Sequence, residues 1–512
     1  MSSSSGRAFL LGLDVGTGAA RAVAYDLAGR PAGIGEASYR LLPAAAGAVE
    51  ADPRSWREAL RRAIAGLARE IDLSAVVAAG MSTLYPALVA MDQEGEALRP
   101  ALLYSDQRSV AQIAALRQAG RIDEIQQRTC NPVSPGTCSL TSLLWLRDNE
   151  PEVFQAAHRF GHAGTYFARW LTGQWAADPS NASLSGLFDP RTGRWDDHLA
   201  RDLGPGRERL PPIVPSHQPA GRLLASVAAE LGLPAGIPVA VGAGDTVCAA
   251  YGAGVVRPGQ AFICSGTTDT VCLCLDNCRF DARLHIGSHA AAGRWLSLAP
   301  MSCGGGCLDW LGGLLASESP GQLLGEAEGA PPGGGLLFLP HLRGERCPVW
   351  ETGSRGVFFG LSDAAGRGEI TRAVLEGVAF ALRQLLEATV EATRQPVATI
   401  TLAGGPTRSN LWNQIKADIL QRELVICPTP YAAARGAALL AGLAAGRVEE
   451  QAWHAEMEPA ARLRPSPAAP AYESRYQAYC ELEQTLGPLF RTRGYSPTTG
   501  NGGHRIGAAG SE

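Results

Sequence analysis

The 512-residue chain carries 45 lysine and arginine residues against 49 aspartate and glutamate residues, a formal net charge of −4. Single hydrophobic cores stop growing at roughly 250–300 residues, so this length predicts two large domains. Hydrophobic residues make up 46% of the chain and charged residues 18%, which excludes wholesale disorder. The acidic balance supplies no basic field, so neither nucleic acid nor a membrane surface is an expected partner.

The cysteines and the apolar segments indicate the cellular compartment in which the protein works. Twelve cysteines are scattered along the chain without the even spacing of a disulfide framework. No apolar leader segment follows Met1, and no run reaches the roughly 18 apolar residues that a membrane-spanning helix needs. These features predict a cytoplasmic protein with reduced thiols.

A strand, a glycine turn and a second strand form the first patterned segment. The apolar run from Phe9 leads through Asp14 into Gly16-Thr17-Gly18, and a second strand follows at 21–27. Residues without bulky Cβ substituents let backbone N–H groups approach a phosphate closely. Here Asp14 is a candidate ligand for Mg²⁺, and the Thr17 hydroxyl is a candidate donor to a phosphate oxygen. An ordinary hairpin is the alternative.

Helical and strand-like patterns alternate in the stretch that follows. Pro53 is well placed at a helix start. The patterns predict helices at 53–71, 110–118, 139–149 and 165–171, and a strand at 75–81.

A second acidic residue follows an apolar strand near the middle of the chain. The strand at 239–243 ends in small residues, and Asp245 then precedes a run of small residues suited to a helix. A carboxylate there could accept a proton from a hydroxyl that attacks a phosphoryl group. Capping a helix is the commoner use of aspartate at such a position, and the residues alone favour the cap.

The second half opens with the pattern of the first. A strand at 261–265 meets a turn of Gly266, Thr267 and Thr268, and a strand ending in an aspartate follows at 270–276. Duplication would place two facing hairpins around one ligand, although the similarity is short. A third turn, Gly404-Gly405, joins a strand at 400–403 to a helix at 411–420, with Ser409 and Asn410 able to bond the edges of an adenine.

Glycine and proline cluster at 252–259, and helical periodicity fades from residue 487. We therefore expect a first domain at 1–253, a second at 254–490 and a flexible tail at 491–512.

The three turns, in this order, resemble the phosphate-1, phosphate-2 and adenosine motifs of the FGGY carbohydrate kinases, relatives of actin and hexokinase. The resemblance runs from about residue 9 to 486 and is strongest to the xylulokinase branch. The other matching stretches are 129–135, 143–147, 149–154, 171–173, 338–346 and 355–360. It implies an α/β fold of two ribonuclease-H-like domains around a central ATP cleft, with the sugar held mainly by the first domain. A homodimer stays open.

The resemblance also implies roles for the matching positions. Asp245 takes the place of the catalytic base, and Asp14 and Asp245 lie where Mg²⁺ binds. The positions expected to bind ATP are Gly16, Thr17, Gly18, Gly266, Thr267, Thr268, Gly404, Gly405, Ser409 and Asn410. Those expected to bind the sugar, beside Asp245, are Ser82, Tyr85, Tyr104, Asp106 and Thr246.

The sugar side departs most from the family. Tyr85 and Pro86 stand where typical xylulokinases carry Met and His, and Thr246 stands where they carry Asn. Changed hydrogen-bond partners can change the substrate. ATP-dependent phosphorylation of D-xylulose is therefore the first expectation, with ribulose, gluconate and glycerol as alternatives. A non-catalytic, nucleotide-gated regulator is the rival class, and the presence of both Asp14 and Asp245 argues against it.

Overall fold

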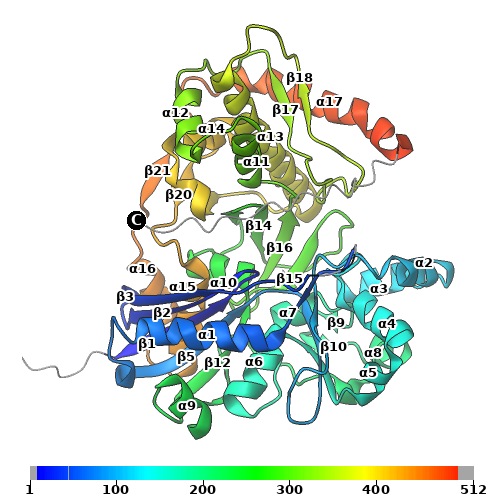
Figure 1. Cartoon of the computed structure of the whole chain (residues 1–512), viewed down its shortest axis with the longest axis vertical. Coiled ribbons are helices and arrows are strands. Elements are labelled where there is room, and N and C mark those ends of the chain that lie inside the picture. The colour runs from blue at the N-terminus through cyan, green and yellow to red at the C-terminus, as the bar shows by residue number, and fades with distance from the viewer. Residues whose placement is uncertain (1–7, 44, 46, 494–512) are drawn as a thin grey trace, which may run out of the picture.

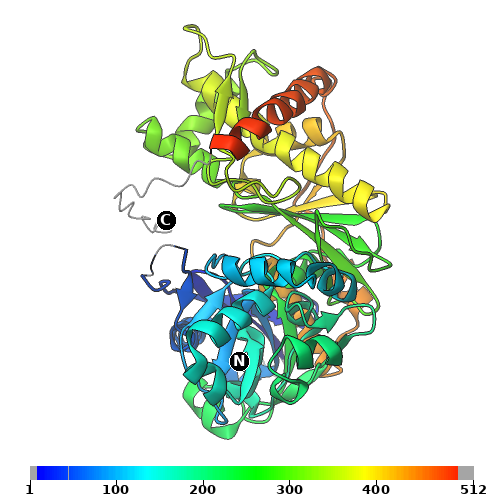
Figure 2. The same cartoon turned by 90° about the vertical axis from the view of Figure 1, so that its right-hand side faces the viewer.

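A computed structural model describes residues 8–43, 45 and 47–493, which form two lobes, one above the other in Figure 1. The first lobe is built on a six-stranded sheet in the order β11-β12-β5-β1-β2-β3. Its strands are β1 (Phe9–Val15), β2 (Ala19–Asp26), β3 (Pro31–Ser38), β5 (Val76–Thr83), β11 (Pro219–Arg222) and β12 (Pro238–Gly244). Figure 2 shows the blue and cyan segments in this lobe and the yellow and red segments in the other.

The second lobe is built on a seven-stranded sheet in the order β15-β16-β14-β13-β19-β20-β21. Its strands are β13 (Gln260–Ser265), β14 (Asp269–Leu275), β15 (His285–Ser288), β16 (Trp295–Pro300), β19 (Thr399–Ala403), β20 (Leu424–Ile426) and β21 (Ala461–Leu463). Its helices are α11 (Gly306–Leu314), α12 (Pro320–Glu328), α13 (Arg367–Thr393), α14 (Asn410–Leu420) and α17 (Ala471–Arg493). A small hairpin of β17 (Leu337–Leu339) and β18 (Val357–Phe359) lies beside them.

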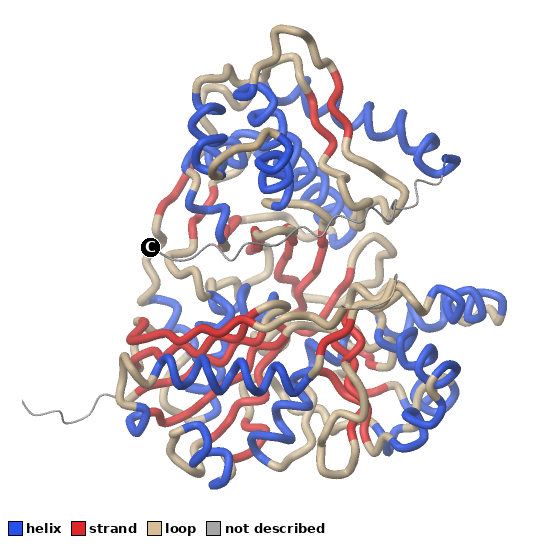
Figure 3. The backbone as a smooth tube through the Cα atoms, viewed as in Figure 1, coloured by secondary structure: helices blue, strands red, loops and turns tan. Residues whose placement is uncertain are grey.

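The two large sheets share one strand arrangement. In the first, β1 pairs with β2 antiparallel and with β5 parallel. In the second, β13 pairs with β14 antiparallel and with β19 parallel. The expected duplication is therefore present: each lobe carries a hairpin beside a parallel strand, and the two-domain α/β fold is confirmed. Figure 3 shows the strands of both sheets, in red, with helices around them.

Helix α1 (Pro53–Leu67) illustrates how sequence dictates a covering helix. Asp52 caps it by accepting a hydrogen bond from the Arg54 N–H at 2.9 Å, and Pro53 occupies its first turn. Its apolar side chains repeat at helical spacing, and Trp56, Leu60 and Ile64 are fully buried against β2 and β3. The helix ends at Leu67, four residues before the predicted end.

The opposite face of the first sheet is covered by α10 (Asp245–Gly252) and α15 (Ala432–Ala444). Helix α15 approaches closely, since a Cβ on Gly12 would lie 1.9 Å from the Ala434 carbonyl oxygen. Helix α15 comes from the second half of the chain yet packs on the first sheet. The domain boundary expected between residues 253 and 254 stays a prediction.

A shared apolar core joins the lobes. Phe262, Cys272 and Cys274 point from the second sheet into a buried cluster with residues of α10 and α15. Both cysteines are fully buried, as expected for small apolar side chains alternating along a strand. All twelve cysteines carry free thiols.

A four-stranded sheet in the order β4-β7-β6-β8 extends the first lobe. Its strands are β4 (Glu50–Ala51), β6 (Ala87–Met91), β7 (Ala101–Leu103) and β8 (Arg159–His162). The remaining elements of the first lobe are α2 (Val110–Gln118), α3 (Ile122–Thr129), α4 (Ser139–Asn149), α5 (Pro151–Ala156), α6 (Ala163–Thr172), α7 (Pro179–Ser183), β9 (Phe188–Asp189), β10 (Arg194–Trp195), α8 (Asp197–Asp202) and α9 (Ala225–Leu231). The predicted helices at 110–118 and 139–149 match α2 and α4.

Two further expectations meet the structure at the end of the chain. Helix α17 continues to Arg493 with Pro488 inside it, so the predicted fading of helical structure from residue 487 is wrong. The remainder of the predicted tail, 494–512, lies outside the described residues. Among the helices that the structure describes, none combines the length and apolar character required to cross a membrane.

Candidate active site

Asp14 lies buried near the end of β1, two residues before the first glycine of the turn. The parallel pairing of β1 with β5 sets Asp14 beside Ser82, whose hydroxyl donates to the Asp14 carboxylate at 2.7 Å. Arg21 lies 3.6 Å from the other carboxylate oxygen. Burial raises the pKa of Asp14, while Ser82 and Arg21 oppose the rise.

The first glycine turn connects β1 to β2. The Gly16 N–H donates to the Ala19 carbonyl at 3.0 Å, and the side of Gly18 that a Cβ would occupy is open. The Tyr39 hydroxyl donates a hydrogen bond to the Gly16 carbonyl. Tyr39 was not predicted as a site residue. It directly follows β3, and the pairing of β3 with β2 brings it beside the turn.

Asp245 begins α10 at the corner where β12 ends. The Thr246 N–H and hydroxyl both donate to one Asp245 oxygen, at 2.6 and 3.2 Å. Gly244 is the N-cap residue, so the interpretation of Asp245 as a helix cap is wrong. Burial, together with the nearby charge of Asp14, raises the pKa of Asp245 to about 7, against the opposing hydrogen bonds from Thr246. A carboxylate with this pKa is suited to accept a proton near neutral pH.

The second glycine turn is held by Asp269, which begins β14. Its carboxylate accepts hydrogen bonds from the Ser265 hydroxyl and the Gly266 N–H, both at 3.1 Å. The buried Lys416 amine donates to the Ser265 hydroxyl at 3.0 Å and lies 3.9 Å from Asp269. The aspartate and lysine therefore stiffen the turn from below, leaving Thr267 and Thr268 at its tip.

A run of three glycines covers this turn. The N–H groups of Gly304 and Gly306 donate to the Thr267 carbonyl, and that of Gly305 donates to the Gly266 carbonyl. A Cβ on Gly304 would lie 2.1 Å from an Asp269 carboxylate oxygen. Close packing, rather than surface flexibility, explains the run.

The third turn presses against the end of β13. Gly404 has φ +111°, and a Cβ there would lie 1.9 Å from the Ser265 carbonyl oxygen, so only glycine fits. Gly405 faces open space. The Ser409 hydroxyl caps α14 by accepting from the Trp412 N–H at 3.2 Å, whereas Asn410 is exposed. Contact of either side chain with adenine stays a prediction.

A cavity of about 240 Å³ lies between the two lobes and joins these parts. From the first lobe it is lined by Thr17, Tyr85, Pro86, Tyr104, Thr137, Leu184, Asp245 and Thr246. From the second lobe it is lined by Cys264, Thr268, Thr270, His285, Leu298, Pro300, Arg346 and Trp350. The first two glycine turns, through Thr17 and Thr268, and Asp245 therefore face one space between the lobes.

The predicted sugar-side residues divide into two groups. Tyr85, Tyr104 and Thr246 line the cavity, and the buried Tyr85 hydroxyl has no hydrogen-bond partner among the described residues. Ser82 is fully buried on Asp14 instead. The Asp106 carboxylate is held by the Val49 N–H at 2.9 Å and by Arg108 at 2.7 Å, behind the Tyr104 loop. Direct contact of Ser82 or Asp106 with a sugar stays a prediction.

The second-lobe wall supplies three residues that the sequence reasoning missed. His285 is buried, and neither ring nitrogen has a hydrogen-bond partner among the residues the structure describes. Burial, with a contribution from Arg346, lowers the pKa of His285 to about 4. Its ring meets Trp350 edge to face at 5.4 Å. Arg346 is the last residue of 338–346, one of the stretches that resemble the family. That match was the only feature of the sequence that could have indicated any of the three residues.

Comparison with known proteins identifies the family to which the chain is similar. The N-terminal domain model of the FGGY family of carbohydrate kinases matches residues 9–252, and the C-terminal domain model matches residues 261–445. A xylulose kinase from Bacillus subtilis is 30% identical over 451 residues, covering 86% of this chain and 89% of that protein. A glycerol kinase from Leptothrix cholodnii is 32% identical over 460 residues, covering 86% and 91%.

Among solved structures, a xyloylose kinase from Brucella ovis superimposes with a TM-score of 0.88 and 31% identity, covering 94% of this chain and all of that one. Kinases of this family phosphorylate sugars with ATP. The chain belongs to the FGGY family of carbohydrate kinases.

Proposed function

We propose that this kinase transfers the γ-phosphoryl group of ATP to a hydroxyl of D-xylulose, giving D-xylulose 5-phosphate. One observation carries the proposal: Asp245, with a pKa of about 7, faces a cavity that Thr17 and Thr268 of the two phosphate turns also line. At about 240 Å³, the cavity is smaller than the roughly 300–1,000 Å³ pockets of drug-sized ligands, which suits a small sugar.

Asp245 acts as the general base in this proposal. A hydroxyl within hydrogen-bond reach would pass its proton to the Asp245 carboxylate as its oxygen attacks the phosphorus. The hydrogen bonds from Thr246 occupy one oxygen of this carboxylate, which leaves the other to receive the proton. Closure of the lobes would exclude water and favour the sugar over hydrolysis of ATP.

The carboxylates of Asp14 and Asp245 fit a divalent cation. Asp14 and Asp245 are two carboxylates close enough for the charge of Asp14 to raise the pKa of Asp245. Oxygen donors of this kind are those that Mg²⁺ prefers. Bound by Asp14 and Asp245, Mg²⁺ would neutralise charge on the phosphates as the phosphoryl group transfers. Ser82 and Arg21 would hold the Asp14 carboxylate in place.

The three turns would bind the nucleotide. Thr17 and Gly18 and, across the cleft, Thr267 and Thr268 would donate to the phosphates. Gly16 and Gly266, whose N–H groups donate within the protein, would shape the two turns around them. Gly404 and Gly405, with Ser409 and Asn410, would receive the adenosine. Open space at Gly18 and Gly405 supports close approach of a ligand to the backbone there.

D-xylulose is preferred because relatives that share most of the chain's length bear the name xylulose kinase. Tyr85 supplies a phenol at the sugar side, and its hydroxyl is buried without a partner in the described protein. A buried donor of this kind costs free energy until a substrate hydroxyl pairs with it.

The test is ADP release with ATP and Mg²⁺ across D-xylulose, ribulose, gluconate and glycerol. We expect kcat/KM for D-xylulose to exceed each of the others by at least about tenfold. A larger value for another compound would move the substrate and keep the mechanism. Binding of ATP with no turnover of any of them would favour the non-catalytic regulator.

A further inference from the structure

We propose that Asp178 and Ser180, at the start of the short helix α7, are positioning residues that hold the backbone corner carrying Asp245. The inference rests on the proposed role of Asp245 as the base. It concerns a buried carboxylate that touches neither the cavity nor the phosphate turns: Asp178 is 1% exposed.

The corner is gripped from two sides. The Gly244 N–H, immediately before Asp245, donates to the Ser180 hydroxyl oxygen at 2.9 Å. On its other side, a Cβ on Gly244 would lie 2.4 Å from the Tyr85 ring. The hydroxyl holds the peptide between Ala243 and Gly244, and the ring packs against the Gly244 Cα, so the backbone that leads into Asp245 has little freedom to rotate.

Asp178 determines which way the Ser180 hydroxyl points. Its Oδ1 accepts from the Ser180 N–H at 3.0 Å, from the Asn181 N–H at 2.9 Å and from the Ser180 hydroxyl. Its Oδ2 accepts from the Asn181 side-chain amide at 2.8 Å. Because the hydroxyl proton is committed to Asp178, the lone pairs of the Ser180 oxygen remain to accept from Gly244.

Burying the Asp178 carboxylate costs free energy. Burial raises the pKa of Asp178, and neutral hydrogen-bond donors rather than a cation oppose the rise. A buried charge without a counter-ion is expensive. A neutral asparagine would keep one acceptor oxygen, but its NH2 group would face the Asn181 side-chain amide that now donates to Oδ2, so the geometry around the Ser180 hydroxyl would be disturbed.

Helix α7 lies against β15 of the second-lobe sheet (Figure 1). At its end, the Ser183 hydroxyl accepts from the Ser288 N–H of β15 at 3.0 Å. The Asn131 side-chain amide bonds both the Ser183 carbonyl, at 3.0 Å, and the Ile286 carbonyl, at 2.8 Å. The corner of Asp245 is therefore fixed relative to the strand whose first residue, His285, lines the cavity.

Small displacements of a base are costly, since a misplacement of about 1 Å can lower a rate by about 10²-fold. The test compares Ser180→Ala with Ser185→Ala. Ser185 is likewise buried and accepts from a backbone N–H, that of Leu187 at 3.0 Å, but it does not touch the corner. Turnover of the best substrate is divided by the concentration of ATP-binding sites, so that a smaller amount of folded protein does not lower the measured kcat.

For Ser180→Ala we expect kcat to fall about 10- to 100-fold while KM for ATP and sugar stays within about threefold. Ser185→Ala should stay within about twofold of the parent. Asp178→Asn should act in the same direction, and the double variant should be no worse than the poorer single one, because both act through one contact. Additive losses, or equal kcat values in the two serine variants, would overturn the proposal.

Amide hydrogen exchange gives a readout that needs no sugar. Ser180→Ala should lose at least about tenfold protection in peptides spanning Gly244, and Ser185→Ala should not. Equal protection in the two variants would also overturn the proposal. An active Asp245→Asn variant, by contrast, would refute the role of Asp245 as the base, and with it the positioning role proposed here, whatever the serine variants do.

Discussion

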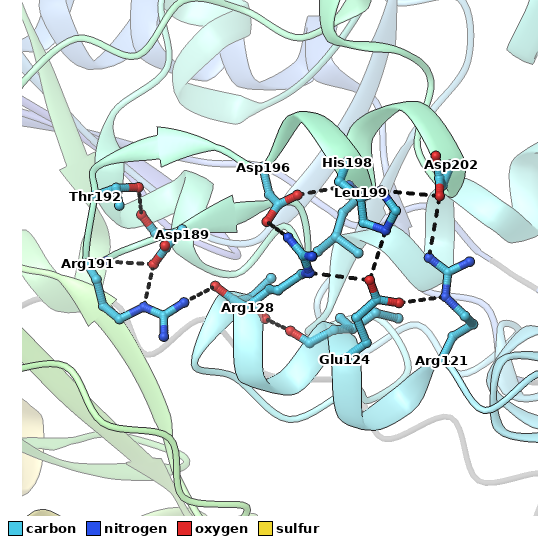
Figure 4. A network of polar contacts seen from close by, with 12 residues as sticks. Arg121, Glu124, Arg128, Asp189, Arg191, Thr192, Asp196, His198, Leu199 and Asp202 are labelled. Atoms are coloured by element: carbon cyan, nitrogen blue, oxygen red, sulfur yellow. Dashed lines mark hydrogen bonds and ion pairs between the residues drawn. The ribbon is translucent and has the colours of Figure 1, made fainter.

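The surface between α3 and α8 and the buried region around Asp14 and Asp245 both gather carboxylates, in opposite surroundings. On the surface, Figure 4 shows Glu124 between Arg121, which donates to it at 2.7 Å, and His198, whose ring nitrogen lies 2.9 Å away. In the buried region, Asp14 is 3.6 Å from Arg21, whose guanidinium also pairs with Glu36. Asp245 has no cation partner within 4 Å among the described residues.

The pKa values follow the surroundings. Arg121 lowers the pKa of Glu124, whereas burial and Asp14 raise the pKa of Asp245. On the surface each charge has a partner, and the network orders one helix against another. In the cleft the charges repel, which costs stability and gives a carboxylate able to take a proton. A buried carboxylate without a cation partner, such as Asp245, indicates a functional role, whereas a paired carboxylate such as Glu124 indicates a structural one.

The largest effect should come from removing the unpaired charge. Asp245→Asn keeps the shape of the side chain but removes a proton acceptor, so we expect kcat to fall by at least about 10²-fold. ATP binding, followed by calorimetry, should persist. The matched control is Glu124→Gln, the same kind of change on the surface, which should leave kcat within about twofold. Comparable kcat values for Asp245→Asn and the parent would refute the base.

A buried cluster of paired charges should give the next largest effect, on stability. His341 lies 2.9 Å from both Glu345 and Glu483. Burial lowers its pKa, but the two carboxylates outweigh burial and raise the pKa to about 9. Substitution by Gln leaves the carboxylates buried without their cation, and we expect the free energy of unfolding to fall by about 3 kcal/mol at pH 6.

The pH dependence of this loss has a definite sign. Because the folded pKa of His341 lies above the unfolded value of about 6.5, its stabilisation is complete below that value and disappears as pH rises through about 9. Urea unfolding at pH 6 and at pH 9.5 should therefore show a gap between parent and His341→Gln that narrows at the higher pH. An equal gap at both pH values would contradict this assignment of charge.

Asp245→Asn should also stabilise the fold. Between the unfolded value of about 3.9 and the folded value of about 7, the folded state binds more protons, so the parent loses stability as pH rises through this window. At pH 8 the variant should gain about 1 kcal/mol or more, and at pH 4 it should gain little. Thermal unfolding at the two pH values measures this difference. A variant less stable than the parent at pH 8 would show that Asp245 is stabilised by its surroundings.

The two buried carboxylates could be predicted from the sequence, because the residues next to them in the chain identify them. Asp14 and Asp245 each follow an apolar strand and adjoin glycine, so their chain neighbours revealed them. Tyr39, His285 and Trp350 were not accessible, because strand pairing and lobe packing bring these residues to the site. Ser180 and Asp178 act through the Gly244 backbone, and no local pattern reports such a contact.

The fold shows the same division. Apolar strands that meet glycine turns predicted the hairpins at β1–β2 and β13–β14, and Gly404 and Gly405 marked a third turn. Long-range packing decided the rest. Helix α15 returns to the first sheet because Gly12 and Gly80 leave room for its backbone, which no window of sequence around α15 reports. Helix α17 passes through Pro488, where local propensity alone predicted an end.

The smallest effect should come from the surface histidine that resembles His341. His198 lies between Glu124, at 2.9 Å, and Asp202, at 3.4 Å, but its side chain is 38% exposed. Solvent and salt screen such pairs, so His198→Gln should change the free energy of unfolding by less than about 1 kcal/mol, and by still less in 1 M salt. Urea unfolding beside His341→Gln makes the comparison direct. Equal losses for the two histidines would mean that burial does not set the strength of a carboxylate–imidazole cluster, and the contrast between surface and cleft would lose its physical basis.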